Sequence, residues 1–278
     1  MPAIYKETVL QLTPIYGGPE ANSITNILFE DLLHIDRIKR LTNTNMQISE
    51  TQKEILNVAI SRLLKNEPIQ HIVGYTHFFG RSFQVNQHTL VPRPETEELV
   101  NLIIGENKTG KPTILDIGTG TGCIAISLEL EIHGSNVTGV DLSEEALQTA
   151  KMNAKALGAH ANFIQMDILN NAPQLRFDII VSNPPYIPMS DKKEMHPNVL
   201  KYDPGSALFV PDDDPLIFYH RIAELGKISL NKGGKVYLEI HENFGEEIKN
   251  LLRENGYENI QVLKDLNGKN RMVSARLG

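Results

Sequence analysis

Four consecutive residues, Asn183, Pro184, Pro185 and Tyr186, combine types that could bind a planar amino group. They directly follow the apolar run 177–182, which is typical of a buried strand. Paired prolines prevent a helix from starting there and lack backbone N–H donors, so we expect a stiff, extended turn. The Asn183 side-chain oxygen and the Pro184 carbonyl are then free to accept two hydrogen bonds from an NH2 group, with Tyr186 as a flat wall. The alternative is a proline-rich loop that only closes a strand.

A glycine-rich loop supplies a place for a reactive cofactor. The apolar run 113–117 precedes this loop and a segment of helical character follows it, which indicates a strand, a loop and a helix. Glycines let the backbone approach a ligand closely, and the start of the helix offers free N–H groups. The loop residues are Gly118, Thr119, Gly120, Thr121 and Gly122. About 20 residues further on, a second strand ends in Asp141, where an acid can bind ribose hydroxyls. The alternative is a tight turn with an Asp that caps a helix.

The spacing of these glycines distinguishes between nucleotide-like ligands. A dinucleotide fingerprint needs G-x-G-x-x-G, but here the third glycine comes one residue early and Cys123 stands in its place. G-x-G-x-G after the acidic Asp116 resembles the first motif of class I S-adenosylmethionine methyltransferases. We therefore expect S-adenosyl-L-methionine as the cofactor and S-adenosyl-L-homocysteine as its product.

Composition narrows the possible classes of function. The net charge of −7 argues against a protein that binds nucleic acid through the phosphate backbone. The single cysteine excludes an internal disulfide and favours a reducing cytoplasm. No run approaches the roughly 18 apolar residues of a membrane span, and the histidines lack metal-ligand spacing. We expect a cytoplasmic, monomeric protein with no metal and with no membrane or nucleic-acid partner.

The elements that must position these residues follow from a change of pattern along the chain. Residues 1–70 have helical spacing, with a capping box at 49–52. From about 69 to 91, aromatic and β-branched residues with two glycines predict a hairpin. Beyond that the rhythm of an α/β sheet begins. Strands are expected near 113–117, 136–141, 161–166, 177–182, 235–240, 259–264 and 271–276. Helices are expected over roughly 95–104, 122–131, 143–157 (with Ser143 as its N-cap), 215–230 and 243–254.

Several further segments resemble one family of amino-group methyltransferases. They are 68–74, 90–97, 233–240 and 265–271. Together with the glycine loop and the Asn183 turn, they resemble the glutamine N5-methyltransferases of peptide chain release factors, the PrmC/HemK family. The segment from Arg93 to Glu97 is the most family-specific part, although carboxylates at a helix start also interact favourably with the helix dipole.

The resemblance implies a fold and a division into domains. The fold is α/β, a class I S-adenosylmethionine methyltransferase with a Rossmann-like, seven-stranded sheet. It carries a small all-α N-terminal domain at 1–70 that recognises the substrate, and a β-hairpin connector at 71–92. The catalytic domain would then cover 93–278. Asp203-Pro204, 210–212 and His241 depart from the family pattern, which leaves the conformation of the 203–215 loop unpredicted.

The resemblance also implies roles for single residues. The loop from Gly118 to Gly122, preceded by Asp116, would hold the methionine end of the cofactor, Asp141 the ribose, and Ile168 the adenine. Asn183 would contact both cofactor and substrate. The substrate glutamine would lie against Pro184, Pro185 and Tyr186, and the residues expected to act in catalysis are Asn183, Pro184 and Tyr186. The implied reaction is methylation of the side-chain amide nitrogen (N5) of the glutamine in the Gly-Gly-Gln motif of class I release factors.

An amide nitrogen is a weak nucleophile because its lone pair is delocalised into the carbonyl. Two acceptors can align it, an effect of at most about 7–11 kcal/mol, and can stabilise the positive charge that develops on nitrogen. The runner-up function is methylation of N6 of adenine in a nucleic acid, since adenine also presents an NH2 group. A non-catalytic, cofactor-binding scaffold is a third possibility, and the intact turn at 183–186 argues against it.

Overall fold

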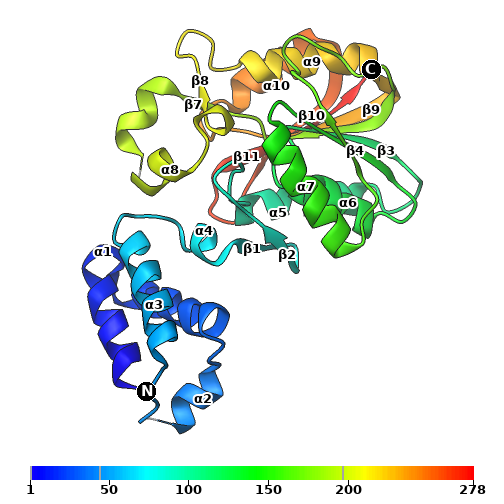
Figure 1. The fold of residues 1–278 in the computed structure, drawn as a ribbon. Coiled ribbons are helices and arrows are strands. Elements are labelled where there is room, and N and C mark those ends of the chain that lie inside the picture. The colour runs from blue at the N-terminus through cyan, green and yellow to red at the C-terminus, as the bar shows by residue number, and fades with distance from the viewer. Residues whose placement is uncertain (1, 44, 196) are drawn as a thin grey trace. The chain divides into compact units, whose positions relative to one another are not determined.

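The structure is a computed structural model that describes residues 2–43, 45–195 and 197–278. The chain forms two compact units. The smaller unit contains the chain up to Tyr75 together with the segment that ends at Tyr202, and the larger unit contains Thr76–Met195 and Asp203–Gly278 (Figure 1). The chain therefore crosses between the units at more than one point.

The smaller unit is helical, as its sequence predicts. Its elements are α1 (Ala3–Ile27), the π-helical turn η1 (Leu28–Leu32), α2 (Arg37–Thr42), α3 (Glu50–Leu63), α4 (Ile69–Val73) and α8 (Pro197–Tyr202). The predicted capping box is confirmed: Ser49 Oγ accepts from Gln52 N at 3.1 Å, and Gln52 Oε1 accepts from Ser49 N at 3.0 Å. Leu12, Leu28 and Phe29 form part of a core of their own in this unit. This separate core explains why the unit is compact by itself.

The predicted start of the hairpin, near residue 69, is wrong. Residues Ile69–Val73 form α4, which starts after Pro68 and ends at Gly74, a residue with φ of 83°. Proline before the first turn and a left-handed glycine after the last are ordinary helix boundaries. The hairpin itself is confirmed over β1 (Tyr75–Phe78) and β2 (Arg81–Gln84).

The larger unit contains a seven-stranded sheet of order β10-β11-β9-β6-β3-β4-β5. The strands are β3 (Thr113–Ile117), β4 (Asn136–Asp141), β5 (Asn162–Gln165), β6 (Phe177–Ser182), β9 (Leu230–Glu239), β10 (Tyr257–Lys264) and β11 (Asn270–Leu277). Only β11 pairs antiparallel, with β9 and β10. The sheet confirms the class I methyltransferase topology expected from the sequence.

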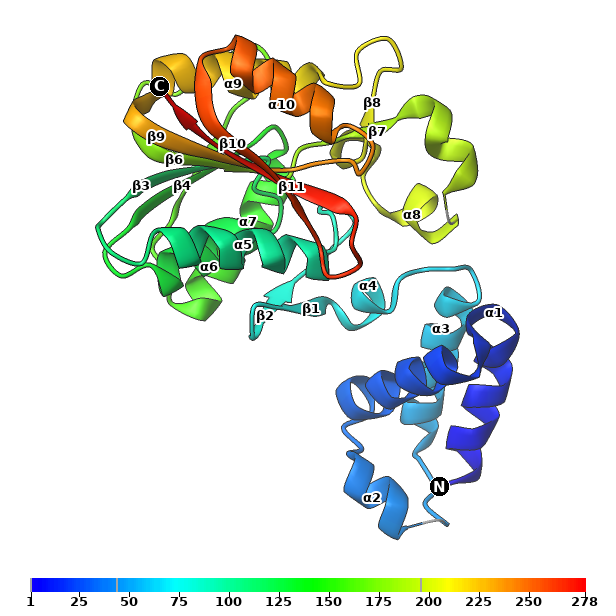
Figure 2. The same cartoon turned by 180° about the vertical axis from the view of Figure 1, so that it is seen from behind.

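Helices cover both faces of this sheet, as Figure 2 shows. One face packs against α5 (Pro94–Glu106), α6 (Cys123–Glu131) and α7 (Glu144–Leu157), and the other against α9 (Ile217–Ser229) and α10 (Gly245–Glu254). Alternate residues of one strand therefore enter different cores: Ile179 and Val181 face α5 and α6, whereas Ile180 faces α9 and α10. This burial on both faces explains the continuous apolar runs in the sequence.

The connection from β6 to α9 holds short elements that the sequence does not predict. They are β7 (Ile187–Pro188), η2 (Met189–Glu194), η3 (Gly205–Ala207) and β8 (Phe209–Val210), and α8 lies between η2 and η3 in the sequence. β7 and β8 pair in parallel.

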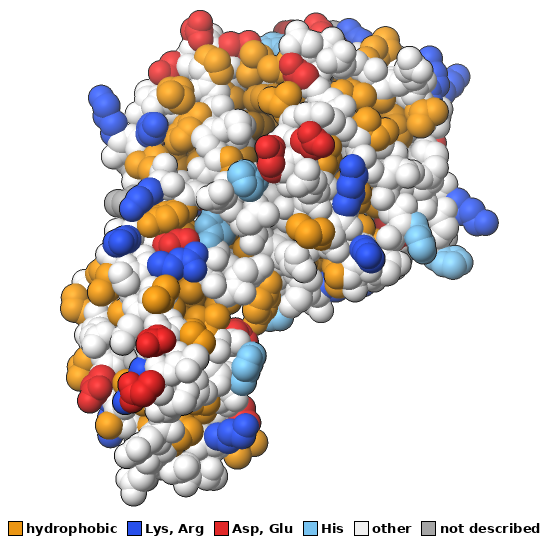
Figure 3. Space-filling view, in the orientation of Figure 1, with side chains coloured by type: hydrophobic (Ala, Val, Ile, Leu, Met, Phe, Trp, Pro, Cys, Tyr) orange, Lys and Arg blue, Asp and Glu red, His pale blue; other side chains and the backbone are white. Residues whose placement is uncertain are grey.

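On the visible face of the larger unit, acidic and basic side chains are interspersed (Figure 3). In the described parts of the chain, no helix combines the length and apolar character that a membrane crossing requires.

Candidate active site

The two sequence motifs meet because their strands are neighbours. Strand β3 pairs in parallel with β6, and Ile117 is opposite Ser182. Gly118 and Asn183 are therefore the first residues beyond the carboxyl ends of adjacent strands. On the other side of β3, Ile117 pairs with Val140, so that Asp141 ends the next strand. The strand order reverses at β3, which is where open α/β sheets bind their ligands.

The glycine loop has a backbone that other residues would strain. Gly118, Gly120 and Gly122 have φ values of 72°, 55° and 79°, in the left-handed region that only glycine occupies readily. A Cβ at Gly122 would lie 2.9 Å from Ile126 Cδ1 and 3.1 Å from Ala150 Cβ. Gly122 thus permits α6 to pack closely against α7, while the earlier glycines turn the loop around the cavity.

Asp116 lies beneath this loop. Its Oδ2 accepts hydrogen bonds from Thr119 Oγ1 at 2.6 Å and from Ala125 N at 3.2 Å. Burial raises the pKa of the Asp116 carboxyl to about 7, against the lowering effect of both hydrogen bonds. Asp116 therefore connects the loop to the first turn of α6, and its side chain is absent from the cavity wall.

Asp141 fastens the loop from the neighbouring strand. Its Oδ2 accepts from Gly120 N at 2.9 Å and its Oδ1 accepts from Ser143 N at 3.0 Å. Burial raises the pKa of Asp141 above its usual range, although these backbone hydrogen bonds favour the charged form. Ser143 caps α7 as predicted, accepting from Ala146 N at 3.0 Å. Each carboxylate oxygen of Asp141 keeps a lone pair for a hydroxyl group of a ligand.

A cavity opens between the loop, the end of β4 and the Asn183 turn. Nine of the residues expected to bind cofactor or substrate line it: Gly118, Thr119, Gly120, Thr121, Asp141, Ile168, Asn183, Pro184 and Pro185. Asp116, Gly122 and Tyr186 do not line it. Further lining residues that the sequence did not single out are Val140, Leu142, Met166 and Phe218, which make one wall apolar.

This lining fits S-adenosylmethionine. The apolar wall around Ile168 suits a flat adenine ring, the Asp141 carboxylate suits two ribose hydroxyls, and the start of α6 suits the methionine carboxylate. Cys123 also lines the cavity, and burial raises the pKa of its thiol to about 12. A thiol with such a pKa stays protonated and unreactive at neutral pH.

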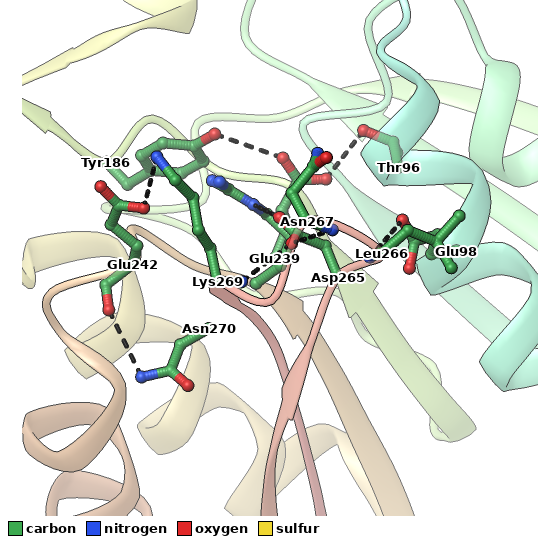
Figure 4. A network of polar contacts seen from close by, with 11 residues as sticks. Thr96, Glu98, Tyr186, Glu239, Glu242, Asp265, Leu266, Asn267, Lys269 and Asn270 are labelled. Carbon is green, nitrogen blue, oxygen red and sulfur yellow. Dashed lines mark hydrogen bonds and ion pairs between the residues drawn. The ribbon is translucent and has the colours of Figure 1, made fainter.

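The Asn183 turn is held by side chains that come from distant segments. Asn183 Nδ2 donates to Thr96 Oγ1 at 3.2 Å, and Thr96 Oγ1 donates to Glu239 Oε2 at 2.7 Å. Tyr186 OH donates to the other oxygen of the same carboxylate, Oε1, at 3.3 Å. Figure 4 shows the side chains of Thr96 and Tyr186 converging on Glu239 from opposite sides. In the described residues, no hydrogen bond reaches Asn183 Oδ1, which remains an available acceptor.

Tyr186 contributes its hydroxyl to this network and its ring to the packing around it. Its ring packs edge-on against the His241 ring, with centroids 6.1 Å apart. Burial and the neighbouring Glu239 raise the pKa of Tyr186 well above its usual range, so it donates a proton to the hydrogen bond at neutral pH. The structure thus shows an anchored tyrosine, whereas the sequence suggested only a flat wall.

Sequence reasoning missed Thr96 and Glu239. Both lie in segments that carry the family resemblance. From the sequence we predicted only a charged helix start around Thr96 and no role for Glu239. The signal that could have found them was the family resemblance, because the segments 93–97, 233–240 and 265–271 each contribute a residue at this network. Arg271 from the last segment donates to Asp265 Oδ2 at 3.1 Å. Burial raises the pKa of Glu239, and the charge of Arg271 opposes this rise.

The described side chains contain no group of three or more His, Cys, Asp or Glu residues arranged to hold a metal ion. The polar groups at the cavity are instead hydrogen-bond acceptors and backbone donors. Such a set can orient a cofactor and an incoming amino group against each other.

Comparisons with known proteins agree with this geometry. A family model described as the methyltransferase small domain matches residues 97–202, and one described as the PrmC N-terminal domain matches residues 5–74. Among solved structures, a methyltransferase from Pyrococcus furiosus has a TM-score of 0.54 at 18% identity, covering 83% of this chain and 100% of that one. A 16S rRNA methyltransferase from T. thermophilus, solved with AdoMet and guanosine, has a TM-score of 0.52 at 18% identity, covering 73% of this chain and 50% of that one. At such identities the likeness concerns the fold.

Curated relatives are much closer in sequence. The release factor glutamine methyltransferase of Bacteroides thetaiotaomicron is 43% identical over 266 residues, which is 95% of each chain. Its counterpart in Flavobacterium psychrophilum is 41% identical over 270 residues, again 95% of each chain. Because this similarity covers 95% of the chain and the PrmC N-terminal domain model matches residues 5–74, the chain belongs to the release factor glutamine methyltransferase family.

Proposed function

We propose that this protein transfers a methyl group from S-adenosylmethionine to the side-chain amide nitrogen (N5) of the glutamine in the Gly-Gly-Gln motif of class I peptide chain release factors. The observation that carries the proposal is the position of Asn183. It lines the cavity that suits the cofactor, and it belongs to the turn that suits a primary amide. Membership of the family supports the same substrate. The proposal implies a cytoplasmic enzyme, and we propose that it acts as a monomer.

The cofactor site is formed by the glycine loop and the ends of two strands. Gly118, Thr119, Gly120 and Thr121 would approach the methionine end with their backbone, while Asp141 would accept from the ribose and Ile168 would pack on the adenine. When bound, S-adenosylmethionine supplies a methyl group that is already activated by its sulfonium sulfur. The protein therefore needs to position the acceptor nitrogen but does not need to activate the methyl group.

The acceptor nitrogen is placed by two hydrogen-bond acceptors of the turn. Asn183 Oδ1 and the Pro184 carbonyl would each accept one N–H of the glutamine NH2 group. This fixes the orientation of the amide plane, and hence that of the nitrogen lone pair, which lies perpendicular to the plane. Such alignment contributes at most about 7–11 kcal/mol. The same two oxygens lie next to the nitrogen while it gains positive charge, and so stabilise the transition state more than the ground state. Pro185 and Tyr186 fix the course of the turn.

The surplus proton needs no dedicated base. A methylated amide that still carries both nitrogen protons is a strong acid, so water can accept one of them. The carboxylates near the turn serve as hydrogen-bond acceptors within the protein: Glu239 is engaged by Thr96 and Tyr186. This arrangement is consistent with a site that works by orientation.

Methylation of adenine N6 in a nucleic acid would use the same turn. The net charge of −7 speaks against it, as does the mixture of acidic and basic side chains on the face drawn in Figure 3. A duplex-binding enzyme would need a basic stripe to neutralise phosphates. The family relationship favours the protein substrate.

Three versions of one release factor test the proposal, with Gln, Asn or Glu in the Gly-Gly-Gln motif. Methyl incorporation at that position is measured by mass spectrometry. The glutamate version offers no N–H to two buried acceptors, and a site built to hydrogen-bond a group rejects analogues without it by roughly 10⁴–10⁵, so we expect no methylation. Asparagine keeps both N–H groups but is one methylene shorter, so we expect a poor substrate. Equal labelling of all three versions would show that the methyl group goes elsewhere, and a nucleic acid added in parallel tests the adenine alternative.

A further inference from the structure

The Asn183 carboxamide can face the cavity in two ways. Its oxygen and its NH2 group have almost the same size, so shape alone does not distinguish the two orientations. Only the orientation with Oδ1 toward the cavity offers an acceptor to a substrate NH2 group. The reverse orientation would present two N–H donors and repel it. Something in the protein must therefore select between them.

We propose that Thr96 and Glu239 are positioning residues that fix the orientation of the Asn183 carboxamide, so that its oxygen faces the substrate. The inference rests on the proposed function, because it concerns how the same amide-binding turn is kept in its working state. It adds two residues to which no role in the reaction is otherwise assigned.

Sheet register brings the three side chains together. Ser182 of β6 pairs with Leu238 of β9, so that Asn183 and Glu239 leave adjacent strands at the same level. Tyr237 belongs to the core on the α5 face of the sheet and Leu238 to the opposite core, so strand alternation directs Glu239 toward α5. Thr96 lies in the first turn of α5 and is 2% exposed, and Glu239 is also 2% exposed. Both side chains are thus buried, and Thr96 also borders the cavity.

The order of donors in this relay has one consistent solution when Glu239 is ionised. An ionised carboxylate can only accept, so the Thr96 hydroxyl must donate its single proton to Glu239 Oε2, at 2.7 Å. Thr96 Oγ1 is then left with lone pairs alone, and it can be satisfied only by the NH2 group of Asn183, at 3.2 Å. That contact leaves Asn183 Oδ1 for the cavity. The negative charge of Glu239, which does not itself contact the substrate, thus determines that Asn183 presents an acceptor to the substrate.

The order of donors in the relay depends on pH, because it depends on whether Glu239 is ionised. Burial raises the pKa of Glu239 to about 7, while the Thr96 hydrogen bond, Arg271 and Tyr186 lower it. A protonated Glu239 could donate to Thr96, whose hydroxyl could then donate to Asn183 Oδ1 and turn the NH2 group toward the cavity. The titratable and charged groups that face Glu239 are Glu95 of α5, Cys123 of α6, Tyr186 of the turn, Tyr219 of α9 and Arg271 of β11. Of these, only the carboxylate of Glu95 adds negative charge near it at neutral pH.

The test compares Thr96→Val, which keeps the shape and removes the hydroxyl, with Thr96→Ser, which keeps the hydroxyl. Full-length protein is assayed for methylation of intact release factor, with cofactor affinity measured by calorimetry. Displacement of a reacting group by about 1 Å can cost about 100-fold, so we expect Thr96→Val to lower kcat by about 10- to 100-fold. KM and cofactor Kd should stay within about threefold, and Thr96→Ser should recover at least half of the wild-type kcat.

The pH profile separates positioning from a merely structural role. We expect the wild-type kcat to fall as the pH drops through about 7, because protonated Glu239 no longer orders the relay. The residual kcat of Thr96→Val should lack this fall, because its Asn183 is uncoupled from Glu239. Glu239→Gln, which cannot ionise, should have a lower kcat than the wild type, and its kcat should likewise not fall as the pH drops through about 7. Tyr237→Phe is the matched control. It removes another buried hydroxyl that donates to a carboxylate, that of Glu106 at 2.8 Å. Tyr237 lies on β9, as Glu239 does, but away from the Asn183 turn.

Each outcome decides one question. Thr96→Val with wild-type kcat and an unchanged pH profile would overturn the inference while leaving the proposed function intact. Wild-type protein that does not methylate the release factor glutamine would overturn the proposed function. If Thr96→Val does not fold, as judged by its melting temperature, Glu239→Gln takes its place, and an unchanged kcat with the acid limb retained in that variant would also overturn the inference.

Discussion

The glycine loop and the Asn183 turn lie side by side at the ends of adjacent strands, yet they are stabilised in different ways. The loop is shaped by its own backbone: positive φ values at its glycines, and two nearby aspartates that accept from its polar groups. The turn is oriented by side chains remote in sequence. Thr96 lies 87 residues before Asn183, and Glu239 lies 143 residues after Thr96.

Because of this difference, we expect the two regions to respond differently to substitutions. A loop determined by local backbone geometry keeps its shape as long as its few residues are kept. A turn oriented by a relay depends on three segments that must all pack correctly. We therefore expect changes at the loop to affect cofactor binding and stability, and changes at the turn to affect turnover.

Asn183→Ala should give the largest effect. It removes one of the two acceptors for the substrate NH2 group, and loss of one preorganised hydrogen-bonding group at a transition state costs about 100- to 1,000-fold in kcat. Cofactor affinity, measured by calorimetry on the same sample, should fall far less, because the loop and Asp141 remain. If cofactor affinity and kcat fell equally, the contrast between loop and turn would be broken.

Asp141→Ala should act in the opposite way, on the cofactor Kd. Hydrogen bonds to a charged group contribute about 1.5–3 kcal/mol each, and this side chain also accepts from Gly120 N and Ser143 N. We expect a rise in Kd of about 10- to 100-fold, with kcat at saturating cofactor changed little. Asp141→Asn is the matched variant and should lie between. An unchanged Kd in both would remove Asp141 from the cofactor site.

Gly122→Ala should have the smallest effect on turnover, because Gly122 does not line the cavity, and should instead lower stability, measured by urea unfolding. The new Cβ would meet Ile126 Cδ1 at 2.9 Å in a residue with φ of 79°, and overpacking costs about 1–3 kcal/mol. Gly158→Ala is the control, because Gly158 has φ of 72° but nothing within 4 Å of its Cβ. It should show only the left-handed strain of about 1–2 kcal/mol. Equal losses would mean that α6 can shift freely.

The sequence predicted the parts of the molecule that local patterns determine. The strands at 113–117, 136–141 and 177–182 are confirmed at both ends, because each is an apolar run closed by glycine, aspartate or asparagine. Strand β9 begins at Leu230, earlier than the predicted 235, because Gly233 and Gly234 resemble a turn. Gly233 in fact has φ of 75° within the strand, which shifts register beside it.

Two further parts of the molecule had no local signal. The two-residue strands β7 and β8 are too short to show a period. The relay from Glu239 to Asn183 depends on pairing between β6 and β9 and on the position of α5, neither of which a linear pattern contains. A sequence can show that a residue is polar in an apolar run, as Glu239 is, but the partner that makes it useful appears only in three dimensions.

Helix α8 has a consequence for how the protein is made. It belongs to the smaller unit, where Tyr202 OH donates to Lys65 O at 3.1 Å, although about 120 residues of the larger unit precede it in the chain. At a synthesis rate of about 5–20 residues per second, those residues take roughly 6 to 24 s to emerge. The smaller unit therefore cannot be complete until the first part of the larger unit, Thr76–Met195, has been synthesised.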